Sequence, residues 1–347
     1  MRTSTLFFCT ILPVVLVSLG ATAQEKEGED ELLERIATLE EGLKGVSSAL
    51  DEVLKKVDDV LWFDRVGDVA DIDKVYLTGP PSPKGEEIYG IKNERHPFRF
   101  WSYVFSPKQP DRGRRYPLLI LPHGGIHADF TTYYTHIIRE LMEQGYVVVA
   151  PEYRGSTGYG RTYYEAIDYG GLEVGDIVAA RDWAVEQLPA VDPGRTGIIG
   201  WSHGGLIALM AAFEHPDKFK AAYAGVPVSD LLARMGYLTR EYREEFSAPY
   251  HIGKTAYEDV EEYRRRSPVW HVEKLKVPLL IHGNTNDRDV NVVEVEHLIR
   301  ALKAAGKNFE YRIYDDAPGG HSFNRMDTKV AKESRKEIYE FLEKHLK

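Results

Sequence analysis

The hydrophobic positions of residues 25–61 follow a seven-residue repeat. Its apolar side chains alternate at spacings of four and three residues: Leu32, Ile36, Leu39, Leu43, Val46, Leu50, Val53, Val57 and Val60. This spacing predicts one amphipathic helix with an apolar stripe, and most of the remaining positions are polar and acidic. Two interpretations stay open. The segment forms an oligomerising coiled coil, or a single helix lays its stripe on the main domain or on a partner. Neither gives the helix a chemical role.

The pattern changes near residue 98, where short apolar runs begin to alternate with amphipathic segments. The runs predict buried strands at 100–105, 116–122, 146–150, 196–201, 221–226, 277–282 and 309–314. The amphipathic segments predict helices near 130–144, 174–188, 203–214, 290–305 and 327–346. This alternation predicts an α/β fold, in which a mostly parallel sheet carries helices on both faces.

The first 23 residues have the pattern of a secretory signal peptide. Arg2 precedes an uncharged, mainly apolar stretch from Leu6 to Leu19, and Ala21-Thr22-Ala23 matches a cleavage motif. The stretch is shorter than the roughly 20 residues that a membrane-spanning helix needs, which favours a cleaved signal peptide. An uncleaved signal anchor is the alternative. We expect an exported protein, periplasmic or secreted, without a membrane span after cleavage. Because Cys9 is the single cysteine, disulfides, thiolate zinc sites and a cysteine nucleophile are excluded from the mature chain.

Residues 62–97 are expected to connect the helix to the α/β domain. The run from Gly79 to Gly85 contains three prolines and cannot continue a helix or a central strand. The sequence therefore predicts a signal peptide over 1–23, the acidic amphipathic helix over 24–61, this connector, and a catalytic domain over 98–347.

Composition places the chain among globular proteins and narrows its partners. Its 347 residues are 43% hydrophobic and 28% charged, which suffices for a sizeable core. The 44 lysines and arginines against 54 aspartates and glutamates give a net charge of −10. An acidic chain is poorly suited to a phosphate backbone, so no nucleic-acid partner is expected.

The strongest chemical motif is Gly200-Trp201-Ser202-His203-Gly204-Gly205. It follows a predicted strand and precedes a predicted helix, which is the context of a nucleophile elbow. The glycines permit a tight turn that presents the Ser202 hydroxyl above the sheet. The same turn directs the backbone amide of His203 toward an oxyanion on the substrate. A chance match is the alternative, and the position between strand and helix argues against it.

A nucleophilic serine needs a base and a carboxylate that orients the base. In elbow folds these partners follow the serine in the order acid, then histidine, each after a strand end. His321 lies in a glycine-rich loop after the last predicted strand, and we expect it to be the base. Asp287 and Asp289 follow the strand at 277–282, and both are candidates for the acid.

A glycine pair follows the strand at 116–122 in the sequence Pro122-His123-Gly124-Gly125-Ile126-His127. Glycine lets the backbone approach a reacting carbonyl, so we expect the Gly125 amide to be the second oxyanion donor. The histidines of this loop lack cysteine neighbours and helical pairing, so no metal site is predicted. The expected chemistry also needs no cofactor.

The substrate pocket is predicted less directly. Tyr153 and Trp201 are candidates to line it, with ordinary packing as the alternative. Residues 229–275 are rich in Tyr, Arg and Glu, and we expect them to form helices over the site. Arg154 is expected to form a structural ion pair.

Together these motifs resemble the catalytic domain of the prolyl oligopeptidase family of serine peptidases, with the acylaminoacyl-peptidase-like branch closest. The shared motifs, in matching order, are His123-Gly-Gly125, Tyr153-Arg-Gly-Ser-Thr-Gly-Tyr-Gly160, Gly200-Trp-Ser202-His-Gly-Gly205, Ser267-Pro268 and Gly320-His321-Ser-Phe323. The resemblance covers about 98–347, without the family's β-propeller. It implies an α/β-hydrolase fold, Ser202 as nucleophile, His321 as base, and Gly125 with His203 as oxyanion donors.

The sequence departs from the family pattern in two motifs. The family's acid loop reads His-Gly, two residues, then Asp, whereas here three residues separate His282-Gly283 from Asp287. The family's Asp-x-x-Val spacing to Val290 is kept, which favours Asp287 over Asp289. In prolyl oligopeptidase itself a tyrosine that donates to the oxyanion stands in place of His123, which leaves that donor in question.

The sequence therefore predicts an exported serine hydrolase that cleaves peptide or amide bonds of short substrates through a Ser-Asp-His triad. A carboxylesterase or deacetylase acting on acyl esters, for example of carbohydrates, is the alternative, because specificity lies in the pocket. A non-catalytic assembly protein is disfavoured by the complete set of triad residues. The expected partners are a small peptide or acyl-ester substrate and further copies of the chain through residues 32–60.

Overall fold

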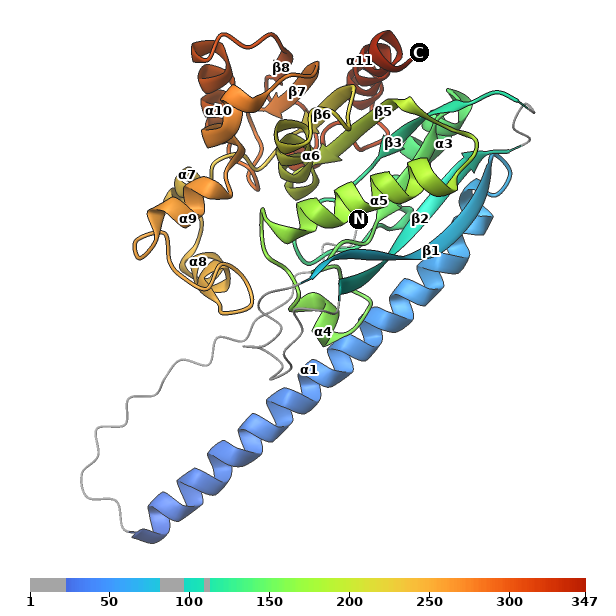
Figure 1. Ribbon diagram of the computed structural model, residues 1–347. Helices are drawn as coiled ribbons and strands as arrows, with labels where there is room; N and C mark the ends of the chain where they lie inside the picture. Colours follow the sequence, from blue (N-terminus) through green and yellow to red (C-terminus); the bar gives the residue numbers. More distant parts are fainter. Residues whose placement is uncertain (1–22, 82–96, 109–112) are drawn as a thin grey trace. The chain divides into compact units, whose positions relative to one another are not determined.

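The computed structural model describes residues 23–81, 97–108 and 113–347 (Figure 1). The chain divides into two units, and their described residues are 23–47 and those from 48 onward. Helix α1 (Ala23–Val66) supplies the described part of the first unit and continues into the second. The predicted signal peptide lies outside the described residues except at its last position. Among the described helices, none combines the length and apolar character that a bilayer-spanning helix needs.

An eight-stranded sheet forms the centre of the second unit, in the order β1-β2-β4-β3-β5-β6-β7-β8. β2 pairs antiparallel with β1 and β4, and the remaining neighbours are parallel. The strands are β1 (Ala70–Pro81), β2 (Pro97–Pro107), β3 (Tyr116–Ile120), β4 (Val147–Pro151), β5 (Val191–Trp201), β6 (Ala221–Gly225), β7 (Leu279–Asn284) and β8 (Glu310–Tyr314). The seven predicted strands and the mostly parallel sheet are thus confirmed.

Helices cover both faces of this sheet, as the sequence predicts (Figure 1). Successive residues of a strand point to opposite faces. Leu118 therefore belongs to the core cluster that includes residues of α5, α6 and α10, and Leu119 to the cluster that includes residues of α3, α11 and the end of α1. The helices after α1 are α3 (Thr135–Glu143), α4 (Arg161–Tyr164), α5 (Leu172–Gln187), α6 (His203–Glu214), α7 (Leu231–Tyr237), α8 (Arg240–Ser247), α9 (Val260–Arg265), α10 (Val292–Ala304) and α11 (Lys329–Leu346), with 3-10 turns η1 (Thr132–Tyr134), η2 (Pro268–Lys274) and η3 (Gly320–Ser322).

The prediction of a connector over residues 62–97 was wrong for most of the residues in this range that the structure describes. Helix α1 continues to Val66 because Trp62 and Val66 are buried against the sheet. Residues 70–81 form strand β1 even though it ends in Gly-Pro-Pro. A strand tolerates proline at an edge, and β1 is an edge strand that pairs with β2 alone. Residues 82–96 lie outside the described part of the chain.

The apolar stripe of α1 is exposed, and another face of the helix packs on the sheet. Leu50, Val53, Val57 and Val60 are between 51% and 69% exposed. The interpretation in which the stripe lies on the main domain is therefore wrong for residues 50–60. The coiled-coil interpretation stays a prediction.

Candidate active site

Ser202 stands at the junction of β5 and α6 in a strained conformation. Its φ of 60° and ψ of −123° lie in a region that residues other than glycine rarely adopt. Its amide donates to the carbonyl of Gly225 at 2.9 Å. A Cβ on Gly200 would lie 2.1 Å from the Gly204 carbonyl oxygen, and one on Gly204 would lie 2.3 Å from that of Pro122. The glycines therefore permit the turn that the elbow motif predicts.

His321 and Asp287 come from separate loops and meet beside this turn. Nδ1 of His321, in η3 after β8, lies 2.7 Å from Oδ2 of Asp287, in the loop after β7. The other carboxylate oxygen of Asp287 accepts the amides of Asp289 and Val290 at 2.9 Å each. Because Nδ1 of His321 donates to the carboxylate, its Nε2 is the nitrogen that can accept a proton. Asp287 thus makes the contact expected of the acid, whereas Asp289 is exposed and lines the neighbouring cavity.

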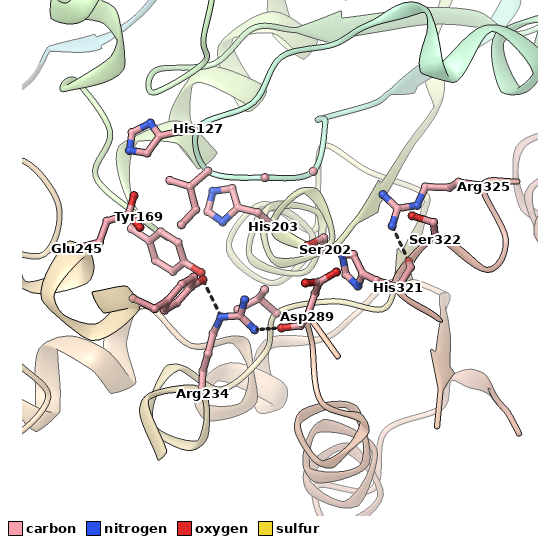
Figure 2. Close-up of a pocket in the computed structure, with 15 residues that line it drawn as sticks. His127, Tyr169, Ser202, His203, Arg234, Glu245, Asp289, His321, Ser322 and Arg325 are labelled. Carbon is pink, nitrogen blue, oxygen red and sulfur yellow. Dashed lines mark hydrogen bonds between the residues drawn. The ribbon is translucent and has the colours of Figure 1, made fainter. Parts of the chain in front are cut away.

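Ser202 and His321 line one cavity of about 410 Å³ (Figure 2). Gly125 and His203 line it as well, so four of the predicted site residues border the same space, with Asp287 behind His321. A cavity of this volume lies within the range of small-ligand sites.

The glycine loop, residues 122–131, brings a second backbone segment to the elbow. A Cβ on Gly124 would lie 3.0 Å from the Trp201 carbonyl oxygen and 3.4 Å from the Ser202 Cβ. Gly125 has a φ of +79°, which favours glycine, and a Cβ there would lie 2.7 Å from the Ala128 Cβ. Backbone from this loop and from the first turn of α6 therefore borders the same cavity.

Tyr153 and Trp201 do not line this cavity, so that prediction was wrong. Both are fully buried. The Tyr153 hydroxyl lies 2.8 Å from the Gly125 carbonyl oxygen and 3.0 Å from that of His123. Nε1 of Trp201 donates to Asn324 at 3.0 Å within the core. Trp201 is a packing residue, and Tyr153 holds the glycine loop through its carbonyls.

Several cavity residues were not singled out by the sequence, and three of them come from the segment 229–275. Arg234 comes from α7, and Tyr242 and Glu245 come from α8. These helices lie within 229–275, so the expectation of helices over the site is confirmed. Arg234 is held by the Tyr242 hydroxyl at 3.0 Å and by Glu294 at 3.1 Å. The composition of this segment was the available signal, but it does not show which side chains face the cavity.

Arg154 forms the structural ion pair that the sequence predicts. Its guanidinium contacts both carboxylate oxygens of Asp176, at 2.7 and 2.8 Å, and both side chains are fully buried.

Among the residues that the structure describes, two groups of side chains could hold a metal ion, because the ligand atoms within each group lie within 4.8 Å of one another. They are His127, Glu245 and His251, and Asp287, Asp289 and His321. In the first group, Nε2 of His127 lies 2.9 Å from Nε2 of His251. Nδ1 of His127 lies 2.9 Å from the Gly155 carbonyl oxygen. Burial lowers the pKa of His127 to about 4, so its neutral ring accepts a hydrogen bond from His251. The prediction of no metal site stays a prediction.

A comparison with known families decides the assignment. The sequence profile described as "Prolyl oligopeptidase family" matches residues 132–347. The chain belongs to this family. The profile begins after the glycine loop, so its match does not include α1, β1 or residues 122–131.

Two curated relatives illustrate how much of a family member the chain covers. This chain is 32% identical over 226 residues to the uncharacterized peptidase YuxL of Bacillus subtilis, and the matched region covers 64% of this chain and 33% of that protein. It is 29% identical over 232 residues to the acylamino-acid-releasing enzyme of Arabidopsis thaliana, covering 65% and 30%. The chain thus spans about a third of the length of these curated relatives.

Solved structures of peptidases share its fold. The acylaminoacyl peptidase of Pyrococcus horikoshii superposes with a TM-score of 0.67 at 21% identity, over 80% of this chain and 42% of that one. A puromycin-hydrolyzing peptidase of Mycobacterium tuberculosis gives 0.66 at 25% identity, over 80% and 39%. These similarities and the strand order confirm the expected α/β-hydrolase fold of this prolyl oligopeptidase family member.

Proposed function

We propose that this member of the prolyl oligopeptidase family is a serine peptidase that cleaves peptide or amide bonds of short substrates. The observation that carries the proposal is the convergence of a strained serine turn and the His321–Asp287 pair on one cavity. Membership of the family supports the reaction class, and relatives named as peptidases and acylamino-acid-releasing enzymes support amide substrates.

The proposed reaction proceeds through an acyl-enzyme. Ser202 Oγ attacks the substrate carbonyl while Nε2 of His321 takes the hydroxyl proton. Asp287 holds the His321 tautomer and stabilises the imidazolium. The amides of Gly125 and His203 donate to the tetrahedral oxyanion. His321 then gives the proton to the leaving amine, and water hydrolyses the acyl-enzyme by the same route.

A paired assay tests this proposal against the esterase alternative. The purified chain is offered aminoacyl p-nitroanilides and matched p-nitrophenyl esters, and kcat/KM is measured for each. We expect clear anilide cleavage. Rapid ester turnover with negligible anilide cleavage would contradict the peptidase assignment and identify a carboxylesterase, because the two activities share the site and differ in the pocket.

Export and self-association complete the proposal. Residues 1–23 support export to the periplasm or medium, and a cytoplasmic product that keeps Met1 would contradict it.

The exposed stripe of α1 supports self-association through residues 32–60. Light scattering should give a mass above one chain for the wild type and the mass of one chain for a Leu39→Lys/Leu43→Lys variant. A wild type of single-chain mass would contradict this part.

A further inference from the structure

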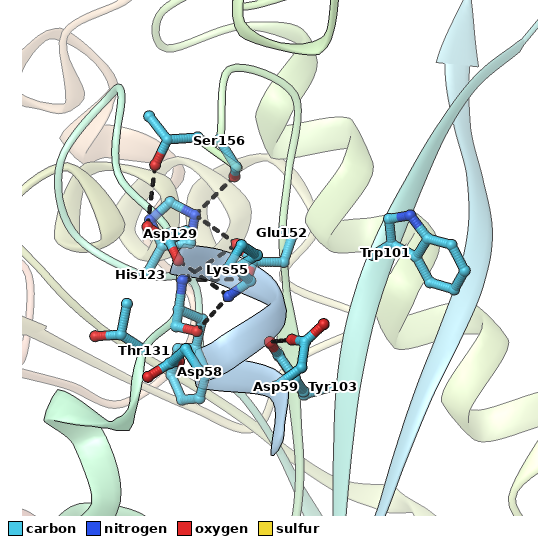
Figure 3. A network of polar contacts seen from close by, with 12 residues as sticks. Lys55, Asp58, Asp59, Trp101, Tyr103, His123, Asp129, Thr131, Glu152 and Ser156 are labelled. Atoms are coloured by element: carbon cyan, nitrogen blue, oxygen red, sulfur yellow. Dashed lines mark hydrogen bonds and ion pairs between the residues drawn. The ribbon is translucent and has the colours of Figure 1, made fainter. Parts of the chain in front are cut away.

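Helix α1 carries a buried lysine behind the glycine loop. Lys55 is 3% exposed, and its Nζ lies 2.7 Å from the Phe130 carbonyl oxygen, 2.5 Å from Oε1 of Glu152 and 3.1 Å from Oδ2 of Asp129 (Figure 3). Asp129 and Phe130 lie near the end of the glycine loop, and Glu152 directly follows β4. A buried charge is costly unless it is paired and hydrogen-bonded. The two carboxylates raise the pKa of Lys55 despite its burial, so the ammonium is charged.

Glu152 connects this lysine to the far end of the glycine loop and lies beside the residue at the start of the loop, His123. It is fully buried, and its oxygens lie 3.1 and 3.2 Å from the Phe130 amide, which donates to them. Its Oε2 lies 3.5 Å from Nε2 of His123, which directly precedes the glycine pair. Burial lowers the pKa of His123 to about 3, so this ring is neutral. Of the described residues within ion-pair distance of Glu152, Lys55 therefore supplies the positive charge.

The same face of α1 makes further contacts with the end of the loop. Asp58 accepts the Thr132 amide at 3.1 Å and the Thr132 hydroxyl at 2.7 Å. The ring of Trp62 stacks on that of Phe130, with centroids 5.3 Å apart and planes 10° apart. Lys55, Asp58 and Trp62 are spaced by three and four residues, which places them on one side of a helix. Phe130 is thus held at its ring and at both backbone polar groups.

The surrounding sequence also makes room for the lysine. A Cβ on Gly158 would lie 2.6 Å from the Lys55 Cβ, and Gly158 has a φ of +84°. This glycine belongs to the Tyr153–Gly160 motif, for which the catalytic mechanism provides no role. Its missing side chain lets α1 approach closely enough for Lys55 to reach Glu152.

We propose that Lys55 is a positioning residue of the active site, which acts through Glu152 and the glycine loop on the Gly125 amide. The proposal rests on the proposed function, because the position of this amide matters only where an oxyanion forms. Backbone donors stabilise a transition state only when they are already in place, and a misplacement of about 1 Å can cost about 100-fold in rate. The helix that the sequence left without a chemical role would then set the geometry of the oxyanion site.

The test compares Lys55→Met with Asp59→Asn in the full chain. Methionine keeps much of the lysine stem and removes its charge. We expect kcat to fall about 10- to 100-fold while KM changes by less than about threefold, because the loop contributes to the transition state rather than to substrate binding. The affinity of a peptide trifluoromethyl ketone, whose adduct carries the oxyanion, should fall in parallel.

Asp59→Asn is the matched control on the same helix. The Asp59 carboxylate contacts the Tyr103 hydroxyl and Nζ of Lys74, the latter at 2.7 and 2.8 Å, so it fastens α1 to β1 and β2 rather than to the loop. We expect its kcat to stay within about threefold of the wild type. An equal loss of kcat in both variants would overturn the proposal, because it would show that undocking of the helix is sufficient. A Lys55→Met variant with wild-type kcat would overturn it as well.

Amide hydrogen exchange over residues 122–134 reads the loop without turnover. We expect faster exchange in Lys55→Met than in Asp59→Asn, and equal exchange would contradict the link. If the wild type cleaves neither substrate, the proposed function fails while this measurement still decides whether Lys55 holds the loop. If Lys55→Met does not fold, Lys55→Met/Glu152→Gln replaces it, because a glutamine at position 152 removes the buried charge that the loss of Lys55 would leave unpaired. The same kinetic and exchange results are expected of it.

Discussion

Replacing Ser202 by Ala is expected to lower kcat on a p-nitroanilide by about 10³- to 10⁶-fold. The Oγ atom that forms the acyl-enzyme is lost, and the oxyanion donors alone provide only residual catalysis. Substrate affinity should change little, since the hydroxyl contributes mainly to the chemical step. The measurement is kcat and KM from steady-state kinetics, with the melting temperature recorded to show that the variant is folded.

A second serine in the same cavity provides the comparison for this variant. Ser322 lines the cavity but lies in the turn η3, without the strained backbone of the elbow. Ser322→Ala should keep kcat within about tenfold of the wild type, because it lacks the activating geometry. Turnover that survives in Ser202→Ala and disappears in Ser322→Ala would reverse the assignment of the nucleophile.

Replacing Asp287 by Asn is expected to lower kcat by about 10³- to 10⁴-fold. The amide would present an N–H to Nδ1 of His321 and favour the tautomer with its proton on Nε2, where the serine proton must go. Burial of Asp287 makes this effect large, because little solvent competes for the imidazole.

Asp289→Asn separates this role from a general effect of charge near His321. Asp289 is exposed, and its backbone amide rather than its carboxylate contacts Asp287. We expect kcat to change by less than about tenfold, since an exposed charge is screened by solvent. A loss equal to that of Asp287→Asn would show that the two carboxylates act as a unit.

The features that could be predicted from the sequence depend on short-range patterns. The strands of the parallel sheet are continuous apolar runs. The glycines around Ser202 indicate a tight turn, because a side chain at these positions would clash with nearby backbone. His321 could be predicted from its order in the chain and its loop. For the strands and the serine turn, the signal therefore lies within the feature itself or beside it in the chain.

The remaining features depend on contacts between distant segments. Asp287 and Asp289 are two residues apart, and a turn in which Asp287 accepts the amides of Asp289 and Val290 decides which one faces His321. The side chain of Trp201 enters the core because of the neighbours on its face of the sheet. The edge strand β1 is recognisable only from its pairing with β2.

Lys55 shows the same limit most clearly. It lies off the apolar stripe of α1, and in the sequence nothing distinguishes it from the other charged residues of this helix. Its partner Glu152 lies 97 positions later, after a buried strand. Burial of such a pair arises from the docking of the helix, which a repeat pattern in one segment does not encode.

In the proposed reaction, Ser202 is the nucleophile of an acyl transfer. The most direct test is to treat the folded chain with a fluorophosphonate, which modifies activated serines, and to locate the adduct by peptide mass spectrometry. The structure predicts one adduct per chain at Ser202, a loss of activity in proportion to labelling, and no adduct in Ser202→Ala. Labelling at another serine, or full activity in a chain labelled at Ser202, would contradict the account.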